Sequence, residues 1–144
     1  MHGCGQGLCL KSREQGKDTM DQFRMLVGVA KRVITPTLGS ELAGFDARKG
    51  GATSVHDDLY ARAVVFEAAG ETVILVTLDL IGISKKTTNE IREAACSPIG
   101  LAAGNIIVCA THTHCGPVTI KHFFNGDQPV DEGYLELLKG RTIE

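Results

Sequence analysis

The chain contains 144 residues with a mass of 15.4 kDa, of which 43% are apolar and 22% charged. This balance is typical of a globular domain and excludes collagen, a coiled coil and long-range disorder. Fifteen Lys and Arg residues stand against 17 Asp and Glu residues, a formal net charge of −2. Because this balance creates no cationic field, no nucleic acid partner is expected.

The apolar runs are too short to cross a membrane. Val73–Val76 and Ile106–Ala110 are the longest of them, far below the roughly 20 residues of a transmembrane helix. Residues 1–24 are polar and lack apolar periodicity, so we interpret them as a flexible N-terminal tail preceding a domain over 25–144. They hold no apolar stretch of signal-peptide length, so no export signal is predicted and the cytoplasm is the default compartment.

Cysteine usage favours reduced thiols. The five cysteines are odd in number and irregularly spaced, unlike a disulfide framework. They are Cys4, Cys9, Cys96, Cys109 and Cys115.

The domain is predicted to begin with a strand and a long loop. Residues 26–30 form a short strand-like run that is closed by Ile34-Thr35-Pro36, since proline cannot donate to a strand ladder. The segment 39–54 is rich in glycine and other turn formers. We expect it to be a loop over a functional site.

A β-hairpin is predicted next. Residues 59–68 and 71–80 are rich in aliphatic and β-branched side chains, and the Ala69-Gly70 pair between them suits a tight turn. The segment 72–78 is almost continuously apolar. We therefore expect it to be a central strand covered on both faces.

The rest of the chain predicts a helix, a strand and a final helix. Ser84 suits a helix N-cap, Ser97-Pro98 ends that helix, and a buried strand follows over 105–111. Strand, helix and strand in this order form a parallel βαβ unit. Asp131-Glu132 begin the last helix. The predicted fold class is α/β, with a mixed sheet, an initial β-hairpin and one βαβ unit.

Ligands of parallel sheets gather at the carboxyl ends of the strands. By that rule residues 79–82 and the residues after Thr111 lie side by side. The latter stretch, from Thr111 to Pro117, reads Thr-His-Thr-His-Cys-Gly-Pro. In an extended chain His112 and His114 point the same way, so both imidazoles can face one metal, or a metal and its substrate. The alternative for each histidine is that it is an ordinary surface or core residue whose ring nitrogens are hydrogen-bonded and bind no ligand.

The stretch Thr111 to Pro117 resembles the Thr-His-Thr-His-Ser-Gly-Pro motif of the neutral/alkaline non-lysosomal ceramidases, in their N-terminal catalytic domain. The resemblance covers about residues 25–138. Further blocks that are similar to the family in sequence order are 27–30 with 34–36, 42–45, 55–63 and 78–82.

The resemblance implies a zinc-dependent amide hydrolase that cleaves a ceramide-like N-acyl lipid into a sphingoid base and a fatty acid. It implies that His112 is a zinc ligand and that His114 is a catalytic residue facing the substrate. In the family a second histidine, a glutamate and a tyrosine complete the zinc site from later segments. We therefore expect a partial catalytic domain, with the remaining Zn²⁺ ligands outside this chain.

Three other residues are weaker candidates for the same site. His56, beside Asp57 and Asp58, is either part of a metal-binding or supporting cluster or lies in a solvated turn. Asp79 either orients an imidazole or binds loop amides. Arg62 either faces the site or pairs with Asp57 or Asp58.

Several other interpretations stay open. Cys109 and Cys115 flank the histidine pair, but no Cys-x-x-Cys spacing supports a structural zinc site. Cys115 stands where the family has serine. A further option is that Cys115 is a nucleophile activated by His112 or His114. Two alternative functions remain. One is another metal-dependent hydrolase, and the other is a non-catalytic fragment or binding module that keeps the fold.

Overall fold

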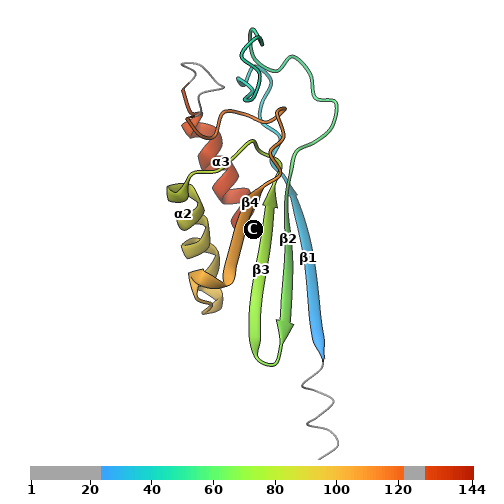
Figure 1. Cartoon of the computed structure of the whole chain (residues 1–144), viewed down its shortest axis with the longest axis vertical. Helices are drawn as coiled ribbons and strands as arrows, with labels where there is room; N and C mark the ends of the chain where they lie inside the picture. The colour runs from blue at the N-terminus through green and yellow to red at the C-terminus, as the bar shows by residue number, and fades with distance from the viewer. Residues whose placement is uncertain (1–23, 122–128) are drawn as a thin grey trace, which may run out of the picture.

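The structure is a computed structural model of the chain, and it describes residues 24–121 and 129–144 (Figure 1). The predicted tail before residue 24 lies outside these ranges, as do His2 and His122, which sequence context assigns to the surface.

The described residues contain a four-stranded mixed sheet in the order β1-β2-β3-β4 (Figure 1). Strand β1 pairs antiparallel with β2, β2 antiparallel with β3, and β3 parallel with β4. The predicted mixed sheet and hairpin are confirmed. The strands are β1 (Met25–Val33), β2 (Tyr60–Ala68), β3 (Glu71–Leu78) and β4 (Ile106–Ala110).

The hairpin turn follows from its two residues. Ala69 has a φ of 51° and Gly70 a φ of 79°, as the tight two-residue turn between twisted strands requires. The first strand continues three residues past the strand-like run 26–30 and ends directly before the predicted stop at 34–36. It does so because every residue of β1 has a partner in β2, from Met25 opposite Ala68 to Val33 opposite Tyr60.

Two helices begin where they were predicted, one after the expected cap Ser84 and the other at the acidic pair Asp131-Glu132. The Ser84 side chain accepts a hydrogen bond from the Thr87 amide at 3.0 Å and starts α2 (Lys85–Cys96). The Asp131 carboxylate accepts from the Tyr134 amide at 2.9 Å and starts α3 (Glu132–Ile143). Two short 3₁₀ turns, η1 (Ser97–Ile99) and η2 (Ala103–Asn105), connect α2 to β4, so the predicted βαβ unit is confirmed. Within the described ranges no helix is long and apolar enough to span a membrane.

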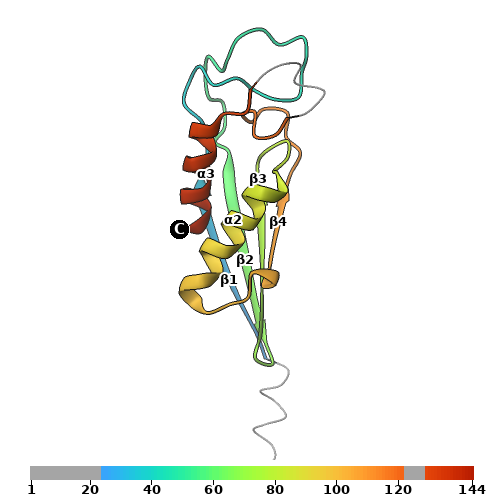
Figure 2. The ribbon, with the colours of Figure 1, turned by 90° about the vertical axis from the view of Figure 1, so that its left-hand side faces the viewer.

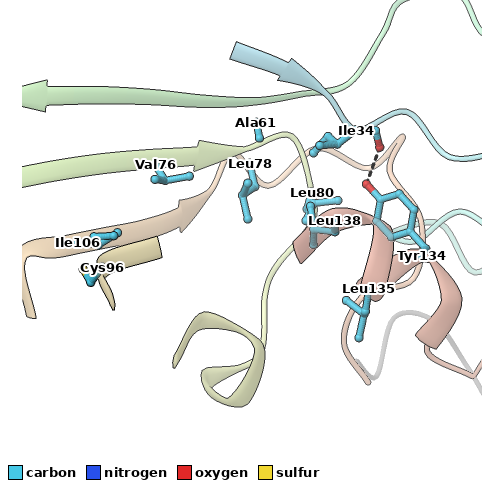
Figure 3. Close-up of a cluster of buried hydrophobic side chains, with 10 residues drawn as sticks. All are labelled: Ile34, Ala61, Val76, Leu78, Leu80, Cys96, Ile106, Tyr134, Leu135 and Leu138. Atoms are coloured by element: carbon cyan, nitrogen blue, oxygen red, sulfur yellow. Dashed lines mark hydrogen bonds between the residues drawn. The ribbon is translucent and has the colours of Figure 1, made fainter. Parts of the chain in front are cut away.

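Both helices pack on the same face of the sheet, and the core lies between them and the strands (Figures 1 and 2). The Tyr134 hydroxyl donates a 2.6 Å hydrogen bond to the main-chain oxygen of Ile34, which ties α3 to the end of β1 (Figure 3). Burial, with a smaller contribution from the Asp131 carboxylate, raises the pKa of Tyr134 above its ordinary value. The buried cluster consists of Ile34, Ala61, Val76, Leu78, Leu80, Cys96, Ile106, Tyr134, Leu135 and Leu138.

The prediction that 72–78 is covered on both faces is wrong for the described part of the chain. Strand β3 is interior in the sheet, but α2 and α3 cover one face only (Figure 1). On that face Val76 is 5% exposed, whereas on the opposite face Val29 is 80% exposed and Ile107 55%. An apolar run shows that a strand can be covered on both faces; whether it is covered depends on which elements pack there.

Candidate functional site

The carboxyl ends of β3 and β4 meet at one edge of the sheet, as predicted. Past the strands, the Thr111 amide donates to the Leu78 oxygen and the His112 amide to the Leu80 oxygen, both at 2.9 Å. The segment 79–82 therefore lies directly beside the histidine motif (Figure 1).

His112 adopts a left-handed backbone conformation with a φ of 65°. The expected extended geometry is therefore wrong at this position, because β4 ends at Ala110 and the chain turns two residues later. A positive φ is uncommon outside glycine, and strained backbone of this kind gathers at functional sites. The turn brings the His112 ring onto the loop that follows β3.

The His112 ring is held in a defined tautomer. Its Nδ1 lies 2.8 Å from the main-chain oxygen of Ile81. Because a carbonyl oxygen can only accept, the proton of this hydrogen bond belongs to Nδ1. In the neutral imidazole, Nε2 then carries the lone pair that a metal ion needs, and a backbone carbonyl behind the imidazole is a usual partner of metal-bound histidine.

His114 comes close to His112 despite the turn between them. The two ring centroids are 5.1 Å apart, edge to face at 71°. The Phe45 ring contacts His114 in the same way, also at 5.1 Å and 71°. The predicted pairing of the two imidazoles is thus present, although it arises from a left-handed turn and not from strand alternation.

The loop 39–54 covers His114, as sequence reasoning expected of this segment. It is joined to the motif by an antiparallel bridge between Leu42 and Pro117 and by a 2.9 Å hydrogen bond from the Ala43 amide to the Gly116 oxygen. Gly44 has a φ of 102°, and a Cβ placed on it would lie 2.5 Å from the Cγ of His114. Only a glycine lets the loop approach the imidazole this closely.

Three residues of this loop were missed as site residues. Gly44 and Phe45 contact the His114 ring, and Arg48 donates to the His114 main-chain oxygen at 3.1 Å. The signals available were the glycine-rich composition of 39–54 and the family-like block 42–45. Neither distinguishes a residue that contacts the histidine from its neighbours in the loop.

Asp79 lies beside the histidine motif, and its carboxylate accepts hydrogen bonds from one main-chain amide and two side chains. Its Oδ2 accepts from the Tyr60 amide at 2.9 Å and from Arg62 at 2.7 Å, and its Oδ1 accepts from the Thr111 hydroxyl at 3.3 Å. The imidazole of His112 is oriented instead by the Ile81 carbonyl. Asp79 thus ties the start of β2 to the residue before His112.

Two further expectations concern Arg62 and His56. The suggested pairing of Arg62 with Asp57 or Asp58 is wrong, since Arg62 forms its ion pair with Asp79. Register explains this, because Arg62 lies opposite Thr77, two residues before Asp79. The His56 side chain is 97% exposed and pairs with Asp57 at 2.6 Å, the solvated-turn alternative.

The described cysteines, Cys96, Cys109 and Cys115, are free thiols. Cys115 is exposed next to the histidines, and its amide donates to the Thr113 hydroxyl at 3.3 Å. Within residues 24–121 and 129–144, no three His, Cys, Asp or Glu side chains lie close enough to share a metal ion. These residues therefore do not by themselves form a tetrahedral zinc site, which needs four ligands.

Comparison with known proteins shows the family and the fold. The sequence of residues 25–128 matches the family described as neutral/alkaline non-lysosomal ceramidase, N-terminal. A comparison with curated protein sequences finds no match. Two solved structures have a similar fold: neutral ceramidase from Pseudomonas aeruginosa, with a TM-score of 0.65 at 22% identity, and a ceramidase complexed with C2, with a TM-score of 0.69 at 23% identity.

The similarity to each covers 83% of this chain and 20% of the other, so the chain spans about a fifth of the length of these enzymes. Because the family match extends over more than half of the 144 residues, the chain belongs to the neutral/alkaline non-lysosomal ceramidase family, in its N-terminal region.

Proposed function

We propose that this chain contributes the first zinc-binding histidine and a substrate-facing histidine to a ceramidase-like amide hydrolase. The single observation that carries the proposal is the 2.8 Å contact between His112 Nδ1 and the Ile81 oxygen. That bond leaves Nε2 as the ligating atom and fixes the plane of the ring before any metal arrives.

The donor set fits zinc in part. Imidazole nitrogen is a common zinc ligand, and His112 is placed where two parallel strands end, the usual ligand edge of such sheets. Family membership supports the same assignment. The remaining ligands would come from residues outside the described part of the chain. The similar structures offer room for them, because the matching region makes up 20% of their length.

When bound, zinc supplies Lewis acidity toward a carbonyl oxygen and activates water near neutral pH. The role we assign to His114 is to donate a hydrogen bond to the substrate carbonyl oxygen as negative charge develops on it. A single donor of this kind is worth roughly 3–4 kcal/mol of transition-state stabilisation. The ring is held for that role by Phe45 and His112, each 5.1 Å away between centroids.

The substrate class follows from the family. We propose an N-acylated sphingoid base, which hydrolysis of the amide converts to a fatty acid and the free base. One of the two similar structures is a ceramidase complexed with C2.

The proposal is tested in a fusion protein that supplies the rest of a ceramidase chain. Residues 24–144 are fused to the part of Pseudomonas aeruginosa neutral ceramidase that follows its matching region, and folding is verified by circular dichroism. We call this fusion the completed chimera. Hydrolysis of an N-acylsphingosine is expected in the chimera and is expected to fall roughly 100- to 1,000-fold in His114→Ala.

The matched control is His56→Ala, which removes an imidazole that is 97% exposed and is expected to leave turnover unchanged. A folded, zinc-loaded chimera that leaves N-acylsphingosine intact would contradict the proposed substrate. Equal losses in His114→Ala and His56→Ala would contradict the role given to His114.

A further inference from the structure

Arg48 joins two main-chain segments that are far apart in sequence. Its Nη2 donates to the His114 oxygen at 3.1 Å and its Nη1 to the Ala43 oxygen at 3.3 Å. The side chain is half-buried. Because the guanidinium group is planar and presents its N–H groups as a fork, one side chain can hold both carbonyls in fixed positions.

The same guanidinium group also lies over an aromatic ring. The Arg48 Cζ is 5.0 Å from the centroid of Phe45, and the Phe45 ring in turn contacts the His114 ring at 5.1 Å. Each of these three residues therefore contacts the other two. Arg48 binds the main chain of His114 and lies over the Phe45 ring, and the Phe45 ring contacts the His114 imidazole.

The local turn explains how Arg48 reaches this position. Its own amide donates to the Phe45 oxygen at 3.1 Å, which closes a tight turn over residues 45–48. Gly44, the residue before that turn, lies against the His114 ring. Holding the turn in place therefore holds both Gly44 and Phe45 against the imidazole.

We propose that Arg48 is a positioning residue for His114, which sets the orientation of this imidazole beside His112 through the His114 carbonyl and the Phe45 ring. The functional importance of this orientation rests on the substrate-facing role proposed for His114. His112 has a separate anchor, the Ile81 oxygen, so loss of Arg48 affects His114 and leaves the metal-ligand histidine in place.

The experiment is nuclear magnetic resonance on the isotopically labelled 144-residue chain. The readouts are the nuclear Overhauser contact between the Phe45 and His114 rings and the ring signals of His112. The variants are Arg48→Met, which keeps the aliphatic stem and loses every donor, and Arg48→Lys, which keeps the charge and loses the planar fork. Lys49→Met, at the exposed neighbouring position, is the matched control.

Arg48→Met is expected to lose the Phe45–His114 contact and to shift the His114 ring signals, with a smaller shift of the His112 signals through the contact between the two imidazoles. Arg48→Lys is expected to weaken the Phe45–His114 contact. Lys49→Met is expected to retain it in full. Should Arg48→Met fail to fold, Arg48→Lys carries the comparison.

A full-strength contact in a folded Arg48 variant overturns the proposal. Equal shifts of the His112 and His114 signals also overturn it, because they would mean general loosening of the site. Neither readout depends on zinc or turnover, so failure of the proposed function leaves this test intact.

Discussion

The Nδ1 of His112 lies 2.8 Å from the main-chain oxygen of Ile81, and this bond connects the ends of two parallel strands. His112 also donates its own amide to the Leu80 oxygen. Two hydrogen bonds to adjacent residues thus hold a histidine whose φ is 65°, a conformation that costs roughly 1–3 kcal/mol. The surrounding loop offsets this cost and presents the imidazole in one tautomer.

Gly44 should be intolerant of any side chain. In Gly44→Ala the methyl group meets the His114 ring, and the φ of 102° adds backbone strain, so we expect a loss of stability greater than the roughly 1–3 kcal/mol of strain alone. Gly39→Ala is the matched control, because Gly39 has a φ of 90° but open space around its Cβ position. Urea unfolding of both variants measures the difference, and equal losses would show that Gly44 does not pack on His114.

Asp79 should matter for stability far more than a surface carboxylate. Asp79→Ala removes the acceptor of the Tyr60 amide and the partner of Arg62, and we expect it to cost about 1–3 kcal/mol. The control is Asp57→Ala, whose side chain is 85% exposed, with an expected change within about 0.5 kcal/mol. Denaturant midpoints that fall equally in the two variants would contradict this assignment.

Tyr134 should make stability depend on alkaline pH. Burial raises its folded-state pKa, whereas the unfolded residue titrates near pH 10, so its stabilising contribution is complete below about pH 10 and declines at higher pH. Tyr134→Phe also loses the bond to the Ile34 oxygen, an expected cost of about 1–3 kcal/mol near neutral pH.

Urea unfolding at pH 8 and at pH 10.5 tests this dependence. The stability difference between the wild type and Tyr134→Phe is expected to shrink at the higher pH. A difference that stays constant or grows with pH would be incompatible with a buried, neutral phenol.

The two faces of the sheet should respond differently to the same substitution. Val76→Thr places a hydroxyl in the core and is expected to cost about 1–3 kcal/mol, because Val76 is 5% exposed. Val29→Thr, at a position that is 80% exposed, is expected to change stability by less than about 0.5 kcal/mol. Comparable losses measured by chemical denaturation would mean that Val29 is covered in solution.

Much of the fold could be predicted because local chemistry determined it. Ser84 and Asp131 cap helices through their own side chains, and Ala69-Gly70 supply the positive φ angles of the hairpin turn. These are interactions between residues close in sequence. The exposed face of β3 could not be predicted, since coverage depends on where both helices pack.

The site was predicted in outline but not in its contacts. The motif identified His112 and His114, yet the positive φ of His112 and its bond to Ile81, 31 residues away in sequence, could not be read from the motif. The contact between Arg48 and His114 spans 66 residues, and that between Arg62 and Asp79 spans 17. Such partners depend on strand register and on how a loop folds back, which residue spacing does not specify.

The most direct test of the central claim is the zinc content of the completed chimera, measured by atomic emission after dialysis, in His112→Ala and His114→Ala. The account predicts that His112→Ala loses zinc, because the ligating Nε2 is gone, and that His114→Ala retains one zinc ion per chain. Zinc retained at full stoichiometry in a folded His112→Ala protein would contradict it.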